Sequence, residues 1–358
     1  MFLDKKLFIP GPVDVLPDVS AKMASPMTGH RSKDYAELHG QLVEKLKKVM
    51  YTQNRVFLTA ASSTGWMEAA VLNCVGKKAL HVVNGAFSKR WHEISLACGK
   101  QADKIEMPWG FAAKSKDVEE KLSSGQYDTL FITHNETSTC AMTPLEGFGE
   151  ICRKNNVLLC VDAVSSMGGV KIEVDKLGID ILVTGTQKCF GVAPGLAMTA
   201  VSQAALDRSK NMKNKGFYFD YQQYLKHYDK SNTPSTPPIP QMYALNYQLG
   251  KILKVEGLEN RFARHRQMAD YTRAWAKKHF GLFTEEWCAS DTVTCVKNNR
   301  NIDLATLSSR LSDKGYEFSN GYGDLKGKVF RVPHMADRTM DELSEYLETI
   351  EKIVGPRP

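Results

Sequence analysis

Residues 179–195 of the chain read IDILVTGTQKCFGVAPG, and the other motifs of the sequence can be understood from this stretch. Its first part, residues 179–183, is almost entirely apolar, which is typical of a short strand buried on both faces. A small polar turn at residues 184–186 ends the strand, and Lys188 follows it. Open α/β sheets bind their ligands at the carboxyl ends of strands, so we expect this lysine in a binding position, although an isolated lysine is more commonly a solvated loop residue.

A second stretch upstream has the same layout. Residues 157–164 read VLLCVDAV, and Asp162 closes an apolar strand. A carboxylate is costly to bury there unless a cation meets it. An amine and a carboxylate at the ends of neighbouring strands suit pyridoxal 5'-phosphate, because a lysine can form a Schiff base with this cofactor while an aspartate pairs with its ring nitrogen. Lys188 and Asp162 are therefore the predicted catalytic residues.

The likeness to a known family is densest in the run HNETSTCAMTPLEGFGEICRKNNVLLCVDAVSSMGGVKIEVDKLGIDILVTGTQKCFGVAPG, residues 134–195. This run resembles the class V pyridoxal-phosphate-dependent aminotransferases, in their serine–pyruvate and alanine–glyoxylate branch, and the likeness extends from Leu7 to near the C-terminus. The resemblance implies an α/β protein of PLP-dependent transferase fold type I, similar to aspartate aminotransferase. It implies a large, mostly parallel-sheet domain over residues 1–255, a smaller C-terminal α+β domain over residues 256–358, and a homodimer with shared active sites.

Composition limits the classes of protein to which the chain can belong. The chain has 358 residues, which exceeds a usual single core and favours two domains, and its 42% hydrophobic content is that of an ordinary globular protein. The net charge of +7 comes from scattered basic residues, so no nucleic-acid partner is predicted. The eight cysteines form no CxxC pair and no metal-ligand spacing, which favours reduced thiols and no metal site. No apolar run has membrane-spanning length, and we expect a cytoplasmic protein without a membrane partner.

A phosphate site is predicted where the strand at residues 55–60 meets a helix. Ser62, Ser63, Thr64 and Gly65 join the strand to the helical run at residues 66–75. A strand, a small polar turn and a helix N-terminus present free N–H groups to a phosphate, but small hydroxyl residues are also ordinary helix caps. The resemblance places the cofactor phosphate on Ser63 and Thr64 with Ser62 beside them, although this turn is less glycine-rich than the family motif.

Further cofactor contacts come from the resemblance alone. The strand at residues 79–84 leads to Phe87, which stands where the family carries an aromatic ring that stacks on the pyridine; the other interpretation is core packing. The strand at residues 129–133 leads to Thr137, which the resemblance makes a hydrogen-bond partner of the cofactor, supported by Glu136. Two residues close to the catalytic pair are also assigned to the cofactor site: Val164, two positions after Asp162, and Gln187, directly before Lys188.

The N-terminal region contains two candidate segments. Residues 10–12 read PGP, a rigid loop that resembles the family segment leading into the active site, and Gly11 is the predicted substrate contact within it. Residues 29–32 read GHRS and precede an amphipathic helix over residues 35–49. The family carries a similar segment near its active site and dimer interface, and capping or surface roles for His30 and Arg31 stay equally open.

Two segments after residue 210 keep more than one interpretation. Residues 212–228 are rich in aromatic side chains, which fits either a substrate or subunit interface or a packed core. Residues 232–240 read NTPSTPPIP, a stiff loop rather than a flexible linker. In the family the matching loop reaches the cofactor phosphate of the neighbouring subunit, so Thr236 is the candidate ligand there. Thr233 replaces a tyrosine of some relatives, which departs from the family pattern.

The C-terminal region predicts alternating helices and strands. Helices are expected at residues 243–253 and 258–279, and two strand–helix pairs then cover residues 292–354, with a Thr339–Glu342 capping box opening the last helix. Arg331 lies in the second of these strands, where an arginine is usually exposed. It matches the family arginine that binds the substrate α-carboxylate, a role for which a planar two-pronged cation is well suited.

The resemblance thus implies a ping-pong aminotransferase that takes an amino group from a small amino acid such as serine or alanine and passes it to a 2-oxo acid such as glyoxylate or pyruvate. A phosphoserine aminotransferase is the nearest alternative. A cysteine desulfurase-like lyase is less favoured, because Gln187 stands where those enzymes place a histidine. The alternative outside enzymology is a silent relative that acts as a binding protein, and the presence of both Lys188 and Asp162 argues against it.

Overall fold

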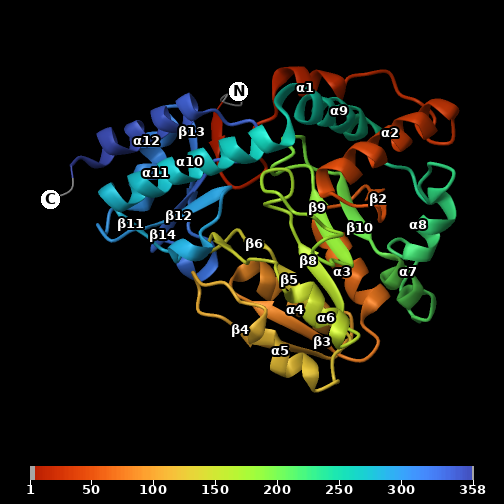
Figure 1. Ribbon diagram of the computed structural model, residues 1–358. Helices are drawn as coiled ribbons and strands as arrows, with labels where there is room; N and C mark the ends of the chain where they lie inside the picture. The colour runs from red at the N-terminus through yellow and green to blue at the C-terminus, as the bar shows by residue number, and fades with distance from the viewer. Residues whose placement is uncertain (1–4, 357–358) are drawn as a thin grey trace.

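The computed structural model describes residues 5–356, and these residues build two β-sheets that lie side by side (Figure 1). Among them, the larger sheet has seven strands, the smaller sheet has five, and a separate two-stranded ribbon consists of β6 (Asn135–Glu136) and β7 (Ala141–Met142). In the part of the chain described, no helix has both the length and the apolar character needed to cross a membrane.

The larger sheet is almost entirely parallel. Its strands lie in the order β2 (Arg55–Thr59), β10 (Ala197–Val201), β9 (Ile181–Gly185), β8 (Leu158–Asp162), β5 (Thr129–Thr133), β3 (Ala79–Val83) and β4 (Ala102–Glu106). Only β10 runs antiparallel to its neighbours. In β8, Leu159 and Val161 pack on one face, whereas Leu158 and Cys160 pack on the other. Because both faces are covered, the strands read as continuous apolar runs, and those predicted from the sequence are confirmed.

Helices cover both faces of this sheet. One face carries α1 (Pro17–Lys22), α2 (Lys33–Met50), α5 (Lys116–Ser123), α6 (Phe148–Lys154) and α9 (Ile239–Gly250). The opposite face carries α3 (Ser63–Cys74), α4 (Ala86–Ala97), α7 (Gln203–Lys210) and α8 (Tyr221–Tyr228). The aromatic segment divides between its two interpretations, because Tyr221 and Tyr224 are buried in the core whereas Phe217 is 67% exposed.

Two helices begin earlier than the sequence predicted. Helix α3 begins at Ser63 rather than at residue 66, so the small polar turn forms its first turn. Helix α9 begins at Ile239 rather than at residue 243 and includes Pro240. A proline fits the first turn of a helix because its missing N–H would have no intrahelical partner there. A π-helical turn, η1 (Lys251–Glu256), continues α9 toward the next helix.

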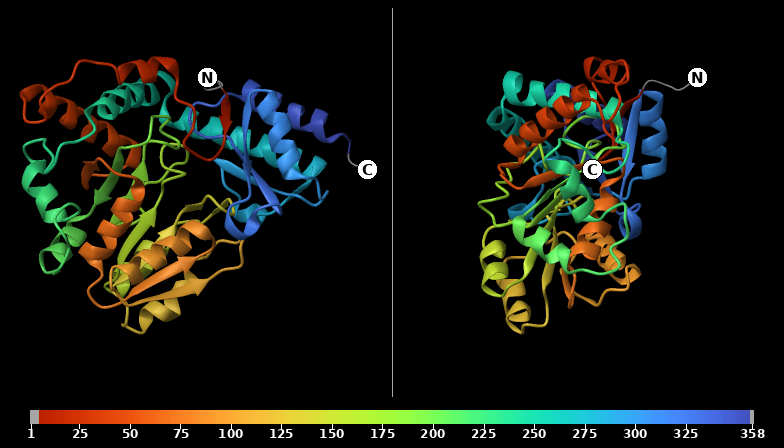
Figure 2. Two further views of the ribbon diagram at one scale, coloured as in Figure 1. Left: turned by 180° about the vertical axis from the view of Figure 1, so that it is seen from behind. Right: turned by 90° about the vertical axis from the view of Figure 1, so that its right-hand side faces the viewer.

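The smaller sheet has the strand order β1 (Lys6–Phe8), β13 (Tyr316–Asn320), β14 (Val329–Pro333), β12 (Val293–Lys297) and β11 (Gly281–Leu282). Helices α10 (Leu258–His279), α11 (Leu304–Asp313) and α12 (Met340–Val354) pack against it, and two 3₁₀ turns complete the region: η2 (Glu286–Cys288) and η3 (Gly323–Leu325). Figure 2 shows β1 beside the C-terminal strands. The N-terminal segment, which the sequence division assigned to the large domain, therefore contributes a strand to the smaller sheet, where it pairs in parallel with β13.

Candidate active site

The carboxyl ends of three neighbouring strands converge on one place. Strands β8 and β9 are paired in parallel with Asp162 opposite Val183, so the loop that carries Lys188 begins beside the end of β8. Strand β5 pairs with β8 on its other side, and its end leads to Thr137. Since these strands run in the same direction, their following residues meet at a single edge of the sheet.

A cavity of about 440 Å³ opens at this edge. It is lined by most of the residues that the sequence predicted, together with several that it did not: Gly11, Pro12, Ser62, Ser63, Thr64, Met67, Phe87, Arg90, Thr137, Asp162, Val164, Ser165, Gln187, Lys188, Pro194 and Tyr322. Two predicted residues do not line it, namely Arg331 and Thr236. The cavity thus brings the cofactor candidates of one chain together and leaves two candidates outside.

Lys188 is half-buried at the cavity wall, and its amine donates a hydrogen bond to the carbonyl of Pro10. The pKa of Lys188 falls to about 8, chiefly because the surrounding protein desolvates the amine and secondly because the cation of Arg331 is nearby. Gly11 lies against the lysine side chain: a Cβ at this position would stand 2.6 Å from Cδ of Lys188, and φ of Gly11 is +109°. Only glycine permits both this backbone conformation and this approach.

Asp162 is buried at the end of β8, and its pKa rises to about 7 because burial disfavours the charged carboxylate. The N–H of Val164 donates to Oδ1 of Asp162 at 2.9 Å, and this hydrogen bond lowers the pKa of Asp162, against the effect of burial. In residues 5–356 no lysine or arginine forms an ion pair with Asp162. The carboxyl group is therefore held in the cavity without the cationic partner that would stabilise its charge.

The turn before α3 forms a small polar cradle. Ser62 is the N-cap of α3 but its side chain makes no capping hydrogen bond, and Oγ of the buried Ser63 has no hydrogen-bond partner among the described residues. Gly185 makes room for this arrangement, because a Cβ there would stand 2.4 Å from Oγ of Ser63 and 2.8 Å from Oε1 of Gln187. A buried hydroxyl without a partner beside a helix N-terminus fits an anionic group such as a phosphate.

Phe87 is positioned by the buried carboxylate of Glu136. The carboxylate accepts hydrogen bonds from the N–H of Phe87 at 3.1 Å and from the N–H of Ser88 at 2.8 Å, which satisfies donors at the start of α4. The ring of Phe87 stacks on Tyr322 of the smaller-sheet region, with centroids 5.3 Å apart and planes at 28°. The ring is therefore anchored from both sides of the cavity.

Thr137 and Arg331 link the two sheets behind the cavity. The hydroxyl of Thr137 donates to Oγ of Ser165 at 2.9 Å, and its carbonyl accepts a hydrogen bond from Nη1 of Arg331 at 3.2 Å. Nε of Arg331 donates to the carbonyl of Asn320 at 3.2 Å. Arg331 is thus buried next to the cavity wall instead of exposed on its strand, contrary to the usual position of a strand arginine.

The proline-rich loop lies away from the cavity of its own chain. Arg31 holds this loop by donating hydrogen bonds to Asn232, to the carbonyl of Thr233 at 2.7 Å and to the carbonyl of Pro234 at 3.3 Å. This contact gives Arg31 a structural role within one chain. Thr236 stays a prediction, because a contact made across a dimer requires the second subunit.

The sequence missed Arg90 and Tyr322 as cavity residues. Arg90 follows Phe87 by three residues on α4, so helical spacing could have placed it on the same face. Tyr322 lies between two glycines in a loop of the smaller-sheet region, and no local pattern marks it as a neighbour of α4. The phenol oxygen of Tyr322 accepts a hydrogen bond from Nη2 of Arg90 at 3.0 Å.

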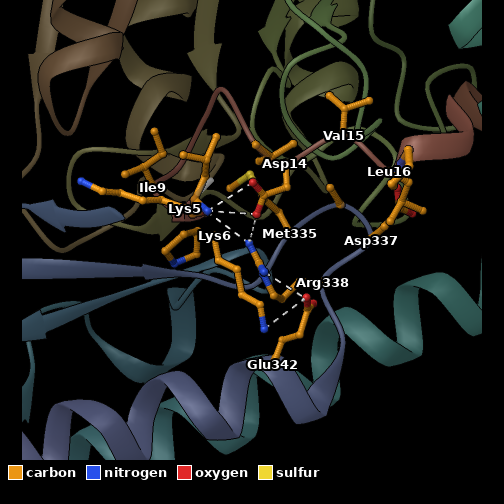
Figure 3. Close-up of a pocket in the computed structure, with 15 residues that line it drawn as sticks. Lys5, Lys6, Ile9, Asp14, Val15, Leu16, Met335, Asp337, Arg338 and Glu342 are labelled. Atoms are coloured by element: carbon orange, nitrogen blue, oxygen red, sulfur yellow. Dashed lines mark hydrogen bonds and ion pairs between the residues drawn. The ribbon is translucent and has the colours of Figure 1, made fainter. Parts of the chain in front are cut away.

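A second cavity, of about 460 Å³, lies where the N-terminal segment crosses the loop after β14 (Figure 3). Most of its charged groups form ion pairs, either within the cavity lining or with residues beside it. Arg338 donates to Asp14 at 2.7 Å and lies 3.4 Å from the carboxylate of Glu342. None of the predicted site residues lines this cavity, and its paired charges indicate a structural junction.

Comparison with known proteins identifies the family. The family model described as class V aminotransferase matches residues 15–321. The chain belongs to the class V aminotransferase family. An uncharacterized aminotransferase of Methanocaldococcus jannaschii is 41% identical over 92% of this chain and 88% of its own. The L-aspartate–glyoxylate aminotransferase of Paracoccus denitrificans is 33% identical over 98% of this chain and 91% of its own.

A solved structure gives the same result for this class V aminotransferase. The alanine–glyoxylate aminotransferase of a Nostoc species superposes with a TM-score of 0.94 at 28% identity, covering 99% of this chain and 96% of that one. The predictions of an α/β protein of fold type I, of an aminotransferase, and of pyridoxal phosphate as its cofactor are confirmed. The partnerless hydroxyl of Ser63 and the uncompensated carboxyl of Asp162 fit the phosphate and the ring nitrogen of this cofactor.

Proposed function

We propose that this class V aminotransferase moves the amino group of a small amino acid to a short 2-oxo acid such as glyoxylate or pyruvate. The observation that carries the proposal is the meeting of Lys188 and Asp162 at one cavity, with Arg331 next to it. Two of the similar proteins named above use glyoxylate, one with aspartate and the other with alanine. Their names therefore support the acceptor more consistently than the donor.

Different cavity residues would bind different parts of the cofactor. Ser62, Ser63 and Thr64 would hold the phosphate at the start of α3, while Asp162 would pair with the ring nitrogen. The ring would lie between Phe87 and Val164, and Thr137 and Gln187 would contact its edge. All of these residues line the cavity. When bound, pyridoxal phosphate supplies an electron-withdrawing ring that makes the Cα–H bond of an attached amino acid acidic.

The residues of the chain then do three things. Arg331 binds the α-carboxylate of the substrate and fixes its orientation, because a guanidinium can donate two parallel hydrogen bonds to a carboxylate. Lys188 carries the proton to and from Cα, and its pKa of about 8 gives it a larger neutral fraction near neutral pH than an ordinary lysine has. Asp162 supplies a negative charge that favours a protonated ring nitrogen. The first substrate leaves as a 2-oxo acid before the acceptor enters, which makes the kinetics ping-pong.

The active enzyme is proposed to be a homodimer, with Thr236 reaching the phosphate site of the neighbouring subunit. The contact of Arg31 with the loop supports this proposal because it fixes the loop conformation before any second subunit binds. A cytoplasmic location is also proposed, and it is supported by the eight cysteines, all of which are free thiols in the structure.

The buried thiol of Cys189 argues against the lyase alternative. Burial raises the pKa of Cys189 to about 12, and its Sγ contacts the carbonyl of Ser165 at 3.4 Å. A desulfurase needs a thiol that ionises readily and can move to its substrate. Cys189 meets neither requirement, although it is adjacent to Lys188.

A screen of donors and acceptors tests the proposal directly. The purified enzyme with pyridoxal phosphate is mixed with L-serine, L-alanine, L-aspartate or O-phospho-L-serine as donor, and with glyoxylate, pyruvate, 2-oxoglutarate or phosphohydroxypyruvate as acceptor. Product amino acids are quantified by chromatography. Turnover with a small donor and glyoxylate or pyruvate is expected. If the protein has the visible absorption band of bound cofactor but no pair gives turnover, the proposal is wrong.

A further inference from the structure

Two guanidinium groups lie at the active-site cavity without a carboxylate partner. Arg90 lines the cavity, and Arg331 lies just behind its wall. Among residues 5–356, neither forms an ion pair, whereas the buried Arg261 of α10 pairs with two carboxylates. One free guanidinium is accounted for by the α-carboxylate of a substrate. The other guanidinium, that of Arg90, has no role in the proposed function.

Arg90 is held in a fixed position by two aromatic rings. Its guanidinium carbon lies 4.8 Å from the ring centroid of Phe87, and Nη2 donates to the phenol oxygen of Tyr322 at 3.0 Å. Arg331 lies over the ring of the same tyrosine, with its guanidinium carbon 5.8 Å from the ring centroid. Tyr322 therefore contacts both cations, Arg90 through its hydroxyl and Arg331 through its ring, next to the cavity.

The charge of Arg90 is felt by the catalytic pair. It lowers the pKa of Lys188 as a smaller contribution after burial and Arg331, and it lowers the pKa of Asp162 against the dominant effect of burial. A cation with these effects lies within the active site instead of projecting into bulk solvent. Only one of its five N–H donors is used in the described structure, so the others can meet a ligand.

We propose that Arg90, positioned by the hydroxyl of Tyr322, binds the side-chain carboxylate of an acidic amino donor of the aspartate or glutamate type. The inference rests on the proposed aminotransferase function and names the substrate class for the same site. An acidic donor carries two carboxylates, and the site offers two guanidiniums that are each suited to bidentate binding.

The same arrangement disfavours a neutral donor. With alanine or asparagine bound, Arg90 would lose part of its hydration when the cavity fills and would gain no opposite charge in return. A site with a buried polar group discriminates strongly against a ligand that leaves the group unpaired. Phosphoserine also carries an anionic side chain, but its phosphate has three oxygens for one guanidinium and one shared hydroxyl, so aspartate is the better match.

The experiment compares L-aspartate with L-asparagine, which has nearly the same shape and no side-chain charge. The enzyme with bound pyridoxal phosphate is assayed with glyoxylate as acceptor, and kcat/KM is measured for both donors. We expect aspartate to be preferred by about 10- to 100-fold, as one charge-assisted hydrogen-bonded contact gives. In the Arg90→Met enzyme this preference is expected to fall to about 3-fold or less, mainly through a higher KM for aspartate.

Two further variants separate recognition from general damage. Tyr322→Phe removes only the hydroxyl and is expected to reduce the preference by about 2- to 10-fold, as a neutral hydrogen bond predicts. Lys89→Met is the matched control, because Lys89 is the neighbouring cation on α4, 58% exposed and paired with Glu93 at 3.7 Å. It does not line the cavity, and it should leave the preference unchanged.

A binding measurement without turnover gives an independent readout. Succinate and butyrate have four carbons each and differ by one carboxylate, and their affinities for the enzyme can be measured by calorimetry. The native enzyme should bind succinate at least about 10-fold more tightly, and Arg90→Met should remove most of this difference.

The outcomes distinguish this inference from the function beneath it. Equal kcat/KM for aspartate and asparagine in the native enzyme, or an unchanged preference in Arg90→Met, would overturn the inference. A phosphoserine rate well above the aspartate rate that collapses in Arg90→Met would also overturn it, in favour of a phosphate ligand. Turnover with alanine but not with aspartate removes only this inference, whereas absence of turnover with every donor removes the proposed function itself.

Discussion

Two groups of buried charges meet the loop at residues 187–191 from opposite sides, and they differ in whether their charges are paired. Behind the loop, Arg261 is fully buried and donates to Glu256 at 2.7 Å and to Asp337 at 3.0 Å. Its remaining donors bind the carbonyls of Gly168 at 2.9 Å and Cys189 at 2.7 Å. We call this group, Arg261 with Glu256 and Asp337, the joint. All three nitrogens of its arginine donate hydrogen bonds, which use four of the five N–H donors.

In front of the loop, the cavity residues lack such partners. Asp162 is buried without a cation, Oγ of Ser63 makes no hydrogen bond, and Arg90 has no carboxylate within the part of the chain described. Burying unpaired polar groups lowers stability, so several of them around one cavity indicate that a ligand completes the set. We therefore interpret the joint as a stabilising element and the cavity as a ligand site, although both are polar and both adjoin the loop at residues 187–191.

The largest effect is expected from removing Lys188 itself. Lys188→Ala should lower turnover by about 10²- to 10⁴-fold or below detection, because in the proposed mechanism the amine both binds the cofactor covalently and moves the Cα proton. The stability of the cofactor-free protein should hardly change. Steady-state kinetics and denaturant unfolding check the two halves of this prediction.

Lys176→Ala is the control for this change, because Lys176 is 75% exposed and, among residues 5–356, pairs only with Glu173. It should leave turnover unaffected. Normal turnover in Lys188→Ala would remove this residue from the mechanism and would leave the cavity without its central group.

The joint should respond in the opposite way. Arg261→Met removes one donor from each of two carboxylates and two carbonyls, all contacts of a fully buried guanidinium, and it should lower the free energy of unfolding by about 3 kcal/mol. Arg266→Met on the same helix is the control: Arg266 is 62% exposed, and its partner Asp291 keeps a contact with Arg273 at 3.5 Å. The control should cost less than about 1 kcal/mol. Equal losses measured by urea unfolding would show that the joint is not the stabilising element.

The sequence predicted the elements near the cavity because their signals are local. Strand β8 is buried on both faces and reads as a continuous apolar run that ends in Asp162, and β9 has the same form before Lys188. Parallel pairing then brings the two strand ends together without further information. The substrate side was predicted less completely, and Arg331 could be assigned only through the family resemblance.

What the sequence could not predict depends on contacts between distant segments. Arg90 and Tyr322 are separated by 232 positions, and neither has a neighbour that marks the pairing. Strand β1 has three residues and joins a sheet formed by the other end of the chain, which no short apolar run can specify. The early start of α9 follows from Pro240, which lies within the first turn of the helix and not before it.

A moderate effect is expected from the pH dependence of Asp162 in the protein stripped of cofactor. The folded state holds a proton on this group up to a pKa of about 7, whereas the ordinary value in the unfolded chain is 3.8. Between these values the folded state binds more protons, so stability must fall as pH rises. From pH 5 to pH 7 the native protein should lose about 2 kcal/mol relative to Asp162→Asn.

Denaturant unfolding of both proteins at several pH values measures this difference, and the other titrating groups cancel in the comparison. Adding pyridoxal phosphate should abolish the slope, because a protonated ring nitrogen supplies the partner that the carboxylate lacks. A parallel pH dependence in the native and Asp162→Asn proteins would show that the carboxyl group is already compensated without the cofactor.

The smallest effect is expected from two buried serines, one whose hydroxyl has no hydrogen-bond partner and one whose hydroxyl has a partner. Ser63→Ala removes a hydroxyl without a partner, so the cofactor-free protein should keep its stability or gain up to about 1 kcal/mol. Its affinity for pyridoxal phosphate should fall about 10-fold or more, as loss of a hydrogen bond to a charged phosphate predicts. Ser88→Ala should do the reverse, because Oγ of Ser88 donates to Glu136 at 2.9 Å at the start of α4, and its loss should cost about 1 kcal/mol of stability. Cofactor titration and thermal unfolding of the two variants measure both quantities. If a missing partner marks a ligand site, Ser63→Ala loses cofactor affinity but not stability, and Ser88→Ala loses stability but not affinity. If both variants change in the same way, a missing partner does not mark a ligand site.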